Sequence, residues 1–273
     1  MKKKNRFLAN KTFVVFSILA VCIILTAVFA PVVTRGVDPL KGSLVDALLP
    51  PCKEHIFGTD KMGRDIFSRV IYGARASLSA TFGVVALIFL VGTVTGVLAG
   101  YFGGVIDAVI MRIADMMLAF PGLVLALAVA GIMGASIKNA IIAIVVVSWT
   151  KYARLARSMV LRVKKNLYIE AAVVNGTRTW KILLVHVLPN MVTQMVVTAA
   201  ADIGTMMLEL ASLSFLGFGA TAPTPEWGLM LNEGRTYMAK APWLMIYPGI
   251  AIVICVVIFN MLGDSIRDVL DPR

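Results

Sequence analysis

The chain has 273 residues, of which 59% are hydrophobic and only 15% are charged, whereas soluble globular domains carry about 25% charged residues. This composition excludes a soluble globular protein, which would need more polar surface to cover its core. The formal net charge of +11 does not predict nucleic-acid binding, because the basic residues lie beside apolar runs and form no module interleaved with aromatic residues. The three cysteines and two histidines lack the spacing of a disulfide framework or a metal site.

The apolar residues gather in runs of roughly 20, the length that an α-helix needs to cross a bilayer. They predict an all-α integral membrane protein with about six transmembrane helices. The first run is too long for the apolar core of a signal peptide and is followed by no A-x-A cleavage site, so we expect it to be retained as a helix. The runs are Thr12–Val33, Ala76–Gly100, Ile106–Met133, Asn139–Arg157, Leu188–Leu210 and Leu244–Leu262.

The distribution of basic residues predicts the orientation. The stretch from Lys151 to Lys181 holds eight Lys or Arg against one acidic residue, Glu170, and such clusters are typical of cytoplasmic loops. A second basic cluster opens the chain, at Lys2, Lys3, Lys4, Arg6 and Lys11. We therefore expect a multi-pass protein of the cell membrane with both termini in the cytoplasm and the 34–75 loop outside.

The motifs of the common chemistries are missing from the sequence. It contains no G-x-x-x-x-G-K-[ST] loop for nucleotide phosphates, no H-E-x-x-H and no G-x-S-x-G. We therefore expect no catalytic residue, no metal site and no cofactor in this chain. If transport is driven by ATP, the ATPase must be another polypeptide.

The most informative segment lies in the expected inner loop between the fourth and fifth spans. Asn166 can cap a short helix there, Gly176 permits a turn, and Thr177 can cap a second short helix. Small side chains on this surface would let the groove of a partner approach closely, and an ordinary amphipathic connector is the alternative. The segment reads Glu170-Ala171-Ala172-Val173-Val174-Asn175-Gly176, and His186-Val187-Leu188-Pro189 follows.

This spacing of Glu-Ala-Ala, Gly and Leu-Pro resembles the motif of ABC-importer permeases, with His186 where Ile is common. The resemblance implies a type I ABC-importer permease fold with a cytoplasmic coupling helix between helices 4 and 5. It implies as partners a second, related permease subunit in a heterodimer, two ABC ATPase subunits that bind ATP and Mg, and an extracytoplasmic solute-binding protein, all in a prokaryotic membrane. The residues implied to contact the ATPase are Glu170, Ala171, Ala172, Gly176, Leu188 and Pro189.

Two further regions, the outer-loop signature within Phe57–Arg69 and the C-terminal part of the chain, narrow the resemblance to the second, C-type permease of peptide/nickel/opine importers. The C-terminal stretches from Ser214 to Gly228, from Asn260 to Asp264 and from Asp271 to Arg273 are similar to those subunits. The division expected from the resemblance is a tail, first helix and outer loop in residues 1–75 and the permease domain in residues 76–273. The outer-loop signature consists of Gly58, Thr59, Asp60, Gly63, Arg64 and Asp65.

The outer segment Thr221–Glu233 looks closer to nickel-type subunits than to dipeptide-type subunits. On this resemblance we expect nickel, free or chelated, as the substrate, with dipeptides or oligopeptides as the alternative.

Acidic residues in the fifth span are candidates for the translocation pathway. Asp202 and Glu209 lie seven residues apart and therefore on roughly one helical face, and charges at membrane depth face a pore or a partner. Met206 between them is a third candidate, although methionine at this spacing is more typical of packing. The alternative for both acids is pairing with a neighbouring helix. In the third span, Arg112 and Asp115 are expected to form a local pair.

Two other classes of protein remain as rivals. An ion-driven secondary transporter would also be apolar and multi-spanning, but it would need no ATPase. A structural subunit of a membrane complex would leave uptake intact when Glu170 or Gly176 is changed.

Overall fold

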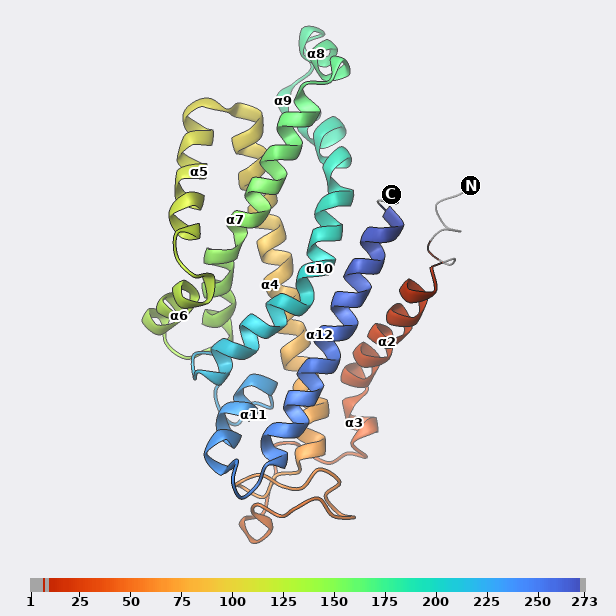
Figure 1. The fold of residues 1–273 in the computed structure, drawn as a ribbon, viewed down its shortest axis with the longest axis vertical. Helices are drawn as coiled ribbons and strands as arrows, with labels where there is room; N and C mark the ends of the chain where they lie inside the picture. The colour runs from red at the N-terminus through yellow and green to blue at the C-terminus, as the bar shows by residue number, and fades with distance from the viewer. Residues whose placement is uncertain (1–6, 8–9, 271–273) are drawn as a thin grey trace.

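The structure, a computed structural model, describes residues 7 and 10–270. Most of the N-terminal basic cluster and the stretch 271–273 lie outside the described residues. Figure 1 shows an elongated helical bundle with short helices projecting at one end and a loop region at the other. The elements are α2 (Lys11–Val28), α3 (Ala30–Val33), η1 (Leu44–Asp46), α4 (Ile66–Phe102), α5 (Gly104–Leu118), α6 (Gly122–Met133), α7 (Ile137–Lys164), α8 (Leu167–Val174), α9 (Thr179–Lys181), η2 (Ile182–Val187), α10 (Leu188–Phe215), α11 (Trp227–Gly234), η3 (Arg235–Tyr237) and α12 (Trp243–Leu270).

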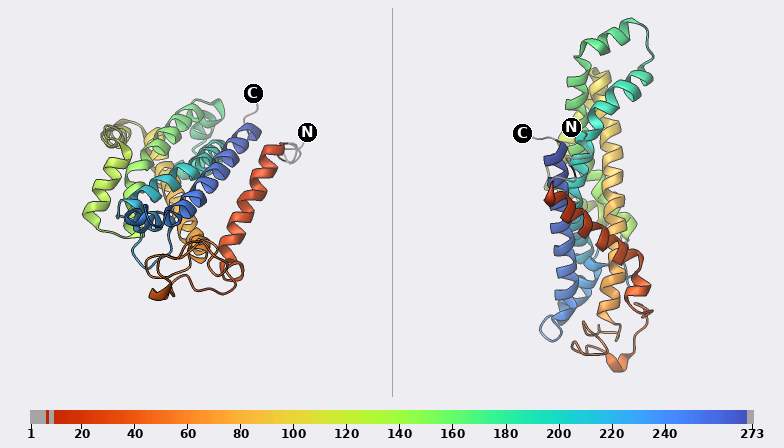
Figure 2. Two further views of the ribbon diagram at one scale, coloured as in Figure 1. Left: turned by 60° about the horizontal axis from the view of Figure 1, so that its bottom comes forward. Right: turned by 90° about the vertical axis from the view of Figure 1, so that its right-hand side faces the viewer.

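Long apolar helices make up most of the bundle. Among the described residues, four helical stretches are long and apolar enough to cross a membrane: α2, α4, α12 and the continuous stretch Thr179–Phe215, which includes α10. The pair α5 and α6 meets the same test together, but it is bent by 95° at its break. α7 has 28 residues and lies along α4 (Figures 1 and 2), although its basic residues make it less apolar than the others.

Two expected spans differ in their bounds because of charged and polar residues. α4 begins at Ile66 rather than Ala76, since Asp65 caps it by accepting a hydrogen bond of 2.7 Å from the backbone N–H of Ser68. The division expected at residue 75 therefore falls inside this helix. α7 continues to Lys164 rather than ending at Arg157, so Arg162 and Lys164 lie within the helix and not in a loop.

The expected single span Ile106–Met133 is broken. α5 ends at Leu118 and α6 begins at Gly122. Pro121 lies in the break, and proline both lacks an N–H and disfavours the helical conformation of the residue before it. The segment is therefore two helices at an angle rather than one straight span.

α4 and α7 approach each other closely through small residues. Gly92, Gly96 and Gly100 recur every fourth residue on the face of α4 that meets α7. A Cβ atom on Gly96 would lie 2.6 Å from Cβ of Ala156, and one on Gly100 would lie 2.8 Å from Cβ of Val160. Such small residues let two helices pack tightly in lipid, and here they fix α7 along the length of α4.

The buried apolar side chains form two clusters that meet at α10. One cluster lies between α4, α6, α7 and α10 and continues to α8 and η2, while the other joins α2, α4, α11 and α12. α10 contributes Met206 and Leu210 to the first cluster and Met207 and Ala211 to the second. Two sides of α10 are thus packed in apolar surroundings.

Candidate functional site

A short helix, α8, projects at one end of the bundle beyond the long helices (Figure 1). Asn166 precedes it in the extended backbone conformation of an N-cap, as expected, but its side chain makes no capping hydrogen bond. Ile169 is only 2% exposed and packs in the first apolar cluster with Ile182 and Val187 of η2. One buried side chain therefore anchors α8 to the bundle.

α8 ends in a turn that depends on Gly176. This glycine has φ of +70°, its N–H donates to the carbonyl of Val173, and the N–H of Thr177 donates to the carbonyl of Ala172. These two bonds form the Schellman arrangement that commonly ends helices at glycine. The expected cap at Thr177 is wrong, because α9 begins after Arg178, once the Schellman turn has used the backbone of Thr177.

The projecting segment exposes apolar side chains to solvent. Leu167, Val174 and Trp180 are 81%, 86% and 58% exposed, while Glu170 and Ala171 are exposed and Ala172 is half-buried. Contiguous exposed apolar surface in a folded protein commonly marks a contact with a partner. The structure thus brings the expected coupling residues Glu170, Ala171, Ala172 and Gly176 together on one projecting surface.

The two remaining coupling candidates lie at the junction with α10. η2 is a π-helix of six residues, and Leu188 and Pro189 follow it as the first residues of α10. Pro189 has no N–H to donate to a preceding carbonyl, which fits a wider helical turn here. π-turns within helices often occur at functional sites. Leu188 and Pro189 therefore connect the projecting segment to the long helix.

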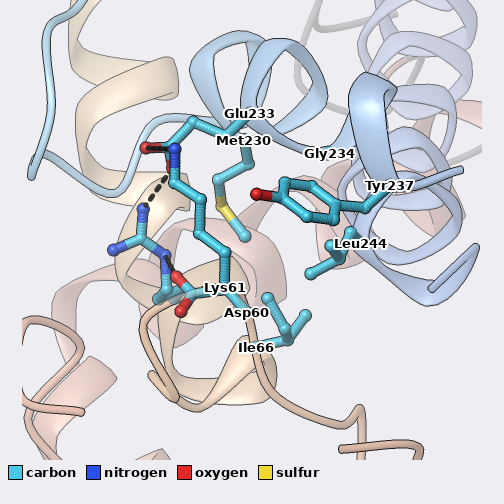
Figure 3. A pocket seen from close by; sticks show the side chains of 9 residues that line it. Asp60, Lys61, Ile66, Met230, Glu233, Gly234, Tyr237 and Leu244 are labelled. Carbon is cyan, nitrogen blue, oxygen red and sulfur yellow. Dashed lines mark hydrogen bonds and ion pairs between the residues drawn. The ribbon is translucent and has the colours of Figure 1, made fainter. Parts of the chain in front are cut away.

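The opposite end of the bundle is closed by an ionic cluster of four residues, Asp60, Arg64, Arg69 and Glu233. The carboxylate of Asp60 accepts a hydrogen bond of 2.6 Å from Nε of Arg64 and lies 3.6 Å from Nε of Arg69. Glu233 of α11 lies 3.3 Å from Nη2 of Arg69 and 3.5 Å from Nη2 of Arg64. Figure 3 shows Asp60 and Glu233 beside the small pocket that they line with Lys61 and Tyr237. The cluster ties the outer loop to α11.

The other signature residues of the outer loop also have structural partners. Gly58 and Gly63 have φ of +75° and +71°, which favours glycine at both turns. The hydroxyl of Thr59 accepts a bond of 2.8 Å from the N–H of Leu49, and Asp65 pairs with His55 Nδ1 at 3.0 Å. The signature therefore specifies the fold of this loop.

α11 is held against α4 by buried polar contacts. Glu226, 1% exposed, caps α11 by accepting from the N–H groups of Gly228 and Leu229, and it also accepts a hydrogen bond of 3.2 Å from the hydroxyl of Ser77. The indole N–H of Trp227 donates to the carbonyl of Val70.

Arg69 and Glu233 were not predicted as site residues, because 164 positions separate them in the sequence.

The acidic residues of α10 have different surroundings. Asp202 is 7% exposed and accepts hydrogen bonds of 2.7 and 2.9 Å from Nζ of Lys151 and of 2.9 Å from the hydroxyl of Tyr152. Asp202 is therefore paired with residues of the neighbouring helix α7. Glu209 is half-buried, and none of the hydrogen bonds or ion pairs among the described residues involves its side chain. Met206 is buried in the first apolar cluster, the packing role that is typical of methionine at this spacing.

Two more ion pairs connect α5 to α7. Arg157 donates to Asp107 with bonds of 2.5 and 2.6 Å, and Arg154 pairs with Asp115. The expected local pair between Arg112 and Asp115 is wrong, because Arg154 on the adjacent helix reaches the carboxylate of Asp115. Neither basic residue of α7 could be matched to its partner from sequence spacing.

Comparison with known proteins assigns the chain to a family. The model described as "Binding-protein-dependent transport system inner membrane component" matches residues 92–273. The chain belongs to this family. A dipeptide transport system permease protein (DppC) of Alkalihalophilus pseudofirmus is 44% identical over 97% of this chain and 86% of its own length. A probable D,D-dipeptide permease (DdpC) of Escherichia coli is 42% identical over 94% and 86%. A glutathione permease (GsiD) of Pectobacterium atrosepticum is 47% identical over 82% and 74%.

A solved structure shows the same fold. An inward-facing conformation of the MetNI methionine ABC transporter matches with a TM-score of 0.59 and 20% identity, covering 75% of this chain and 97% of that chain. The chain therefore has the type I ABC-importer permease fold, as expected. It is a C-type permease subunit of the peptide/nickel family of ABC importers and a multi-pass component of the inner membrane.

Proposed function

We propose that the chain is the pore-forming permease of an ATP-driven importer of dipeptides or similarly small peptides. The observation that carries this proposal is the projecting α8 surface on a chain whose relatives are named dipeptide, D,D-dipeptide and glutathione permeases. This supports the peptide alternative of the sequence analysis over nickel.

The surroundings of the segment 221–233 explain why it is a poor indicator of nickel. Glu226 caps α11 and Glu233 binds Arg64 and Arg69, so its acidic side chains are engaged in holding the outer cap. Among the described residues, no group of three or more His, Cys, Asp or Glu is arranged to hold a metal ion. The likeness of this segment to nickel-type subunits therefore gives no support to a nickel substrate.

The partners follow from the same proposal. α8, with Glu170, Ala171, Ala172 and Gly176, docks on an ATPase subunit that binds ATP and Mg, and Leu188 and Pro189 pass its movement to α10. A second, related permease completes the pore, and a solute-binding protein delivers the peptide at the outer cap. In this arrangement α8 and both termini lie in the cytoplasm.

Uptake in cells tests the substrate. Cells that lack this gene should lose accumulation of a radiolabelled dipeptide, an excess of unlabelled dipeptide should compete in wild-type cells, and the restored gene should recover uptake. Accumulation of trace nickel, measured in parallel, should not change. Loss of nickel uptake with intact dipeptide uptake would reject the peptide proposal and leave the family assignment unchanged.

A matched pair of charge reversals tests the docking. Glu170→Lys reverses an exposed charge on α8, and Glu54→Lys makes the same change on an exposed residue of the outer loop. Only the first should abolish ATP-driven uptake and weaken co-purification of the ATPase, with both proteins present in the membrane at wild-type levels. Full uptake by the Glu170→Lys protein would exclude this residue from the contact with the ATPase.

A further inference from the structure

One face of α10 is polar along most of its length. Its polar residues recur every three or four positions, and at 3.6 residues per turn they fall within an arc of about 80°. The stripe covers 18 of the 1.5 Å steps of the helix, or about 27 Å, close to the thickness of the hydrocarbon core. We call these residues the polar stripe: Gln194, Thr198, Asp202, Thr205, Glu209 and Ser212.

The stripe is only partly covered within this chain, where Asp202 alone is buried. Thr205 is exposed, and four of the other stripe residues are half-buried. The hydroxyls of Thr198 and Ser212 donate to carbonyls of their own helix, so the neutral residues tolerate apolar surroundings. Glu209 has no such partner among the described residues, and a carboxylate facing lipid would be costly. Water or another protein must therefore lie against this face.

Lys151 places a positive charge beside the stripe at membrane depth. It lies midway along the 28 residues of α7, and its partner Asp202 lies midway along the 28 residues of α10. The side chain of Lys151 is nevertheless 60% exposed, while that of Asp202 is 10% exposed. An ammonium in that position faces an aqueous cavity or a bundle interior rather than lipid tails.

We propose that the polar stripe and Lys151 line the path of the transported peptide, and that Lys151 and Glu209 bind its carboxylate and its ammonium. This inference rests on the proposed import of peptides. An ammonium group has three donors, and Lys151 uses Nζ for two bonds to the carboxylate of Asp202. Its exposed side leaves a donor for the carboxylate of a peptide. Asp202, fixed by the hydroxyl of Tyr152, is a positioning residue that neutralises Lys151 when no peptide is bound.

The spacing of the two charged positions suits a short peptide. The rise of 1.5 Å per residue separates Asp202 and Glu209 by about 10 Å along the helix. An extended dipeptide spans at most about 7 Å, and a charge-assisted hydrogen bond at each end adds about 2.8 Å. A dipeptide can therefore reach from Lys151 to Glu209, with its side chains directed across the stripe.

Transport by the complete complex in proteoliposomes tests the inference. The substrates are radiolabelled dialanine, its C-terminal amide and its N-acetyl derivative, each at a concentration that saturates the same binding protein. One variant is Lys151→Met combined with Asp202→Asn, which avoids leaving a buried carboxylate unpaired, and another is Glu209→Gln. Lys138→Met, at an exposed lysine near the outer end of α7, is the matched control.

Each variant should lose discrimination at one end of the peptide. The Lys151→Met/Asp202→Asn protein should lower the uptake ratio of dialanine to its amide by about tenfold or more, the effect of a hydrogen bond to a charged group. It should leave the ratio to the N-acetyl derivative unchanged. Glu209→Gln should lower the uptake ratio of dialanine to its N-acetyl derivative and leave the ratio to the amide unchanged. Lys138→Met should preserve both ratios.

Other outcomes overturn the inference. Normal transport with both ratios unchanged would show that these charges do not bind the peptide. Failure of both variants to assemble with the second permease would make these charges structural contacts between the permeases. A wild-type complex that transports none of the three peptides rejects the proposed function and this inference with it. Dialanine transport by the wild type with unchanged ratios in the variants rejects this inference alone.

Discussion

The two ends of the bundle are held together in different ways. At the end that carries the 34–65 loop, Asp60, Arg69 and Glu233 are paired with one another inside the chain. At the opposite end, a single buried side chain, Ile169, anchors α8, and apolar residues such as Val174 remain exposed. The charged residues of the loop end therefore serve the fold of this chain, whereas the Glu170–Gly176 segment at the α8 end depends on few contacts inside the chain. Substitutions at the two ends should therefore separate folding from coupling.

The largest effect is expected at the outer ionic cluster. Arg69→Met removes a guanidinium that is 1% exposed between two carboxylates, and breaking a buried ion pair costs about 3–5 kcal/mol. Equilibrium unfolding in mixed micelles of denaturing and mild detergent measures the loss. Lys61→Met is the control, since Lys61 is 40% exposed and 3.9 Å from Glu233, and it should cost less than about 1 kcal/mol. Equal losses would show that burial of charge does not hold the cap.

A smaller and more local effect is expected at the anchor of α8. Ile169→Ala removes a buried side chain, which costs about 2–5 kcal/mol. The loss should appear as faster hydrogen exchange in the backbone of α8, with the exchange of α4 and α12 unchanged. The matched control Val174→Ala, at a residue 86% exposed, should leave the exchange as in the wild type. Faster exchange throughout the bundle would contradict the separation between the two ends.

The next largest effect is expected at the turn after α8. Gly176→Val places a side chain at φ of +70°, which costs about 1–2 kcal/mol for an L-residue, although no atom lies within 4 Å of the added Cβ. ATP-driven uptake should fall while the protein inserts normally. Gly176→Asn is the control, because asparagine tolerates this backbone region, and it should retain more uptake than the valine variant. Equal uptake by the two variants would exclude the backbone as the cause.

The smallest effect on stability is expected at the exposed apolar surface. Val174→Asp should change the free energy of unfolding by no more than about 0.5 kcal/mol, yet it should reduce co-purification of the ATPase. Val45→Asp, at a residue of the outer loop that is 90% exposed, makes the same change at the other end of the molecule and should leave the ATPase bound. Loss of the ATPase from both variants would point to a general defect of the complex.

Much of the fold and of the coupling segment was predictable because it depends on local patterns. Apolar runs indicated the membrane helices, and the Glu170–Gly176 segment indicated a short helix ended by a glycine turn. The exact ends of helices were less predictable, because they depend on which backbone groups form the hydrogen bonds of a turn. The cap placed at Thr177 belongs to Arg178 instead, and the span around Pro121 is two helices. The residues that contact an ATPase remain predictions until the coupling variants are measured.

The sequence by itself determined that this is a membrane protein and which family it resembles, since hydropathy and short motifs are properties of neighbouring residues. Tertiary structure alone decided which charges meet. Arg69 pairs with Glu233, which is 164 positions away in the sequence. Lys151 of α7 pairs with Asp202 of α10, which is 51 positions away. The physical reason is that the partner of a charge at membrane depth depends on which helix packs beside it. That packing depends on the size of the side chains at the contact, and α7 packs closely against α4 because Gly96 and Gly100 have no side chain.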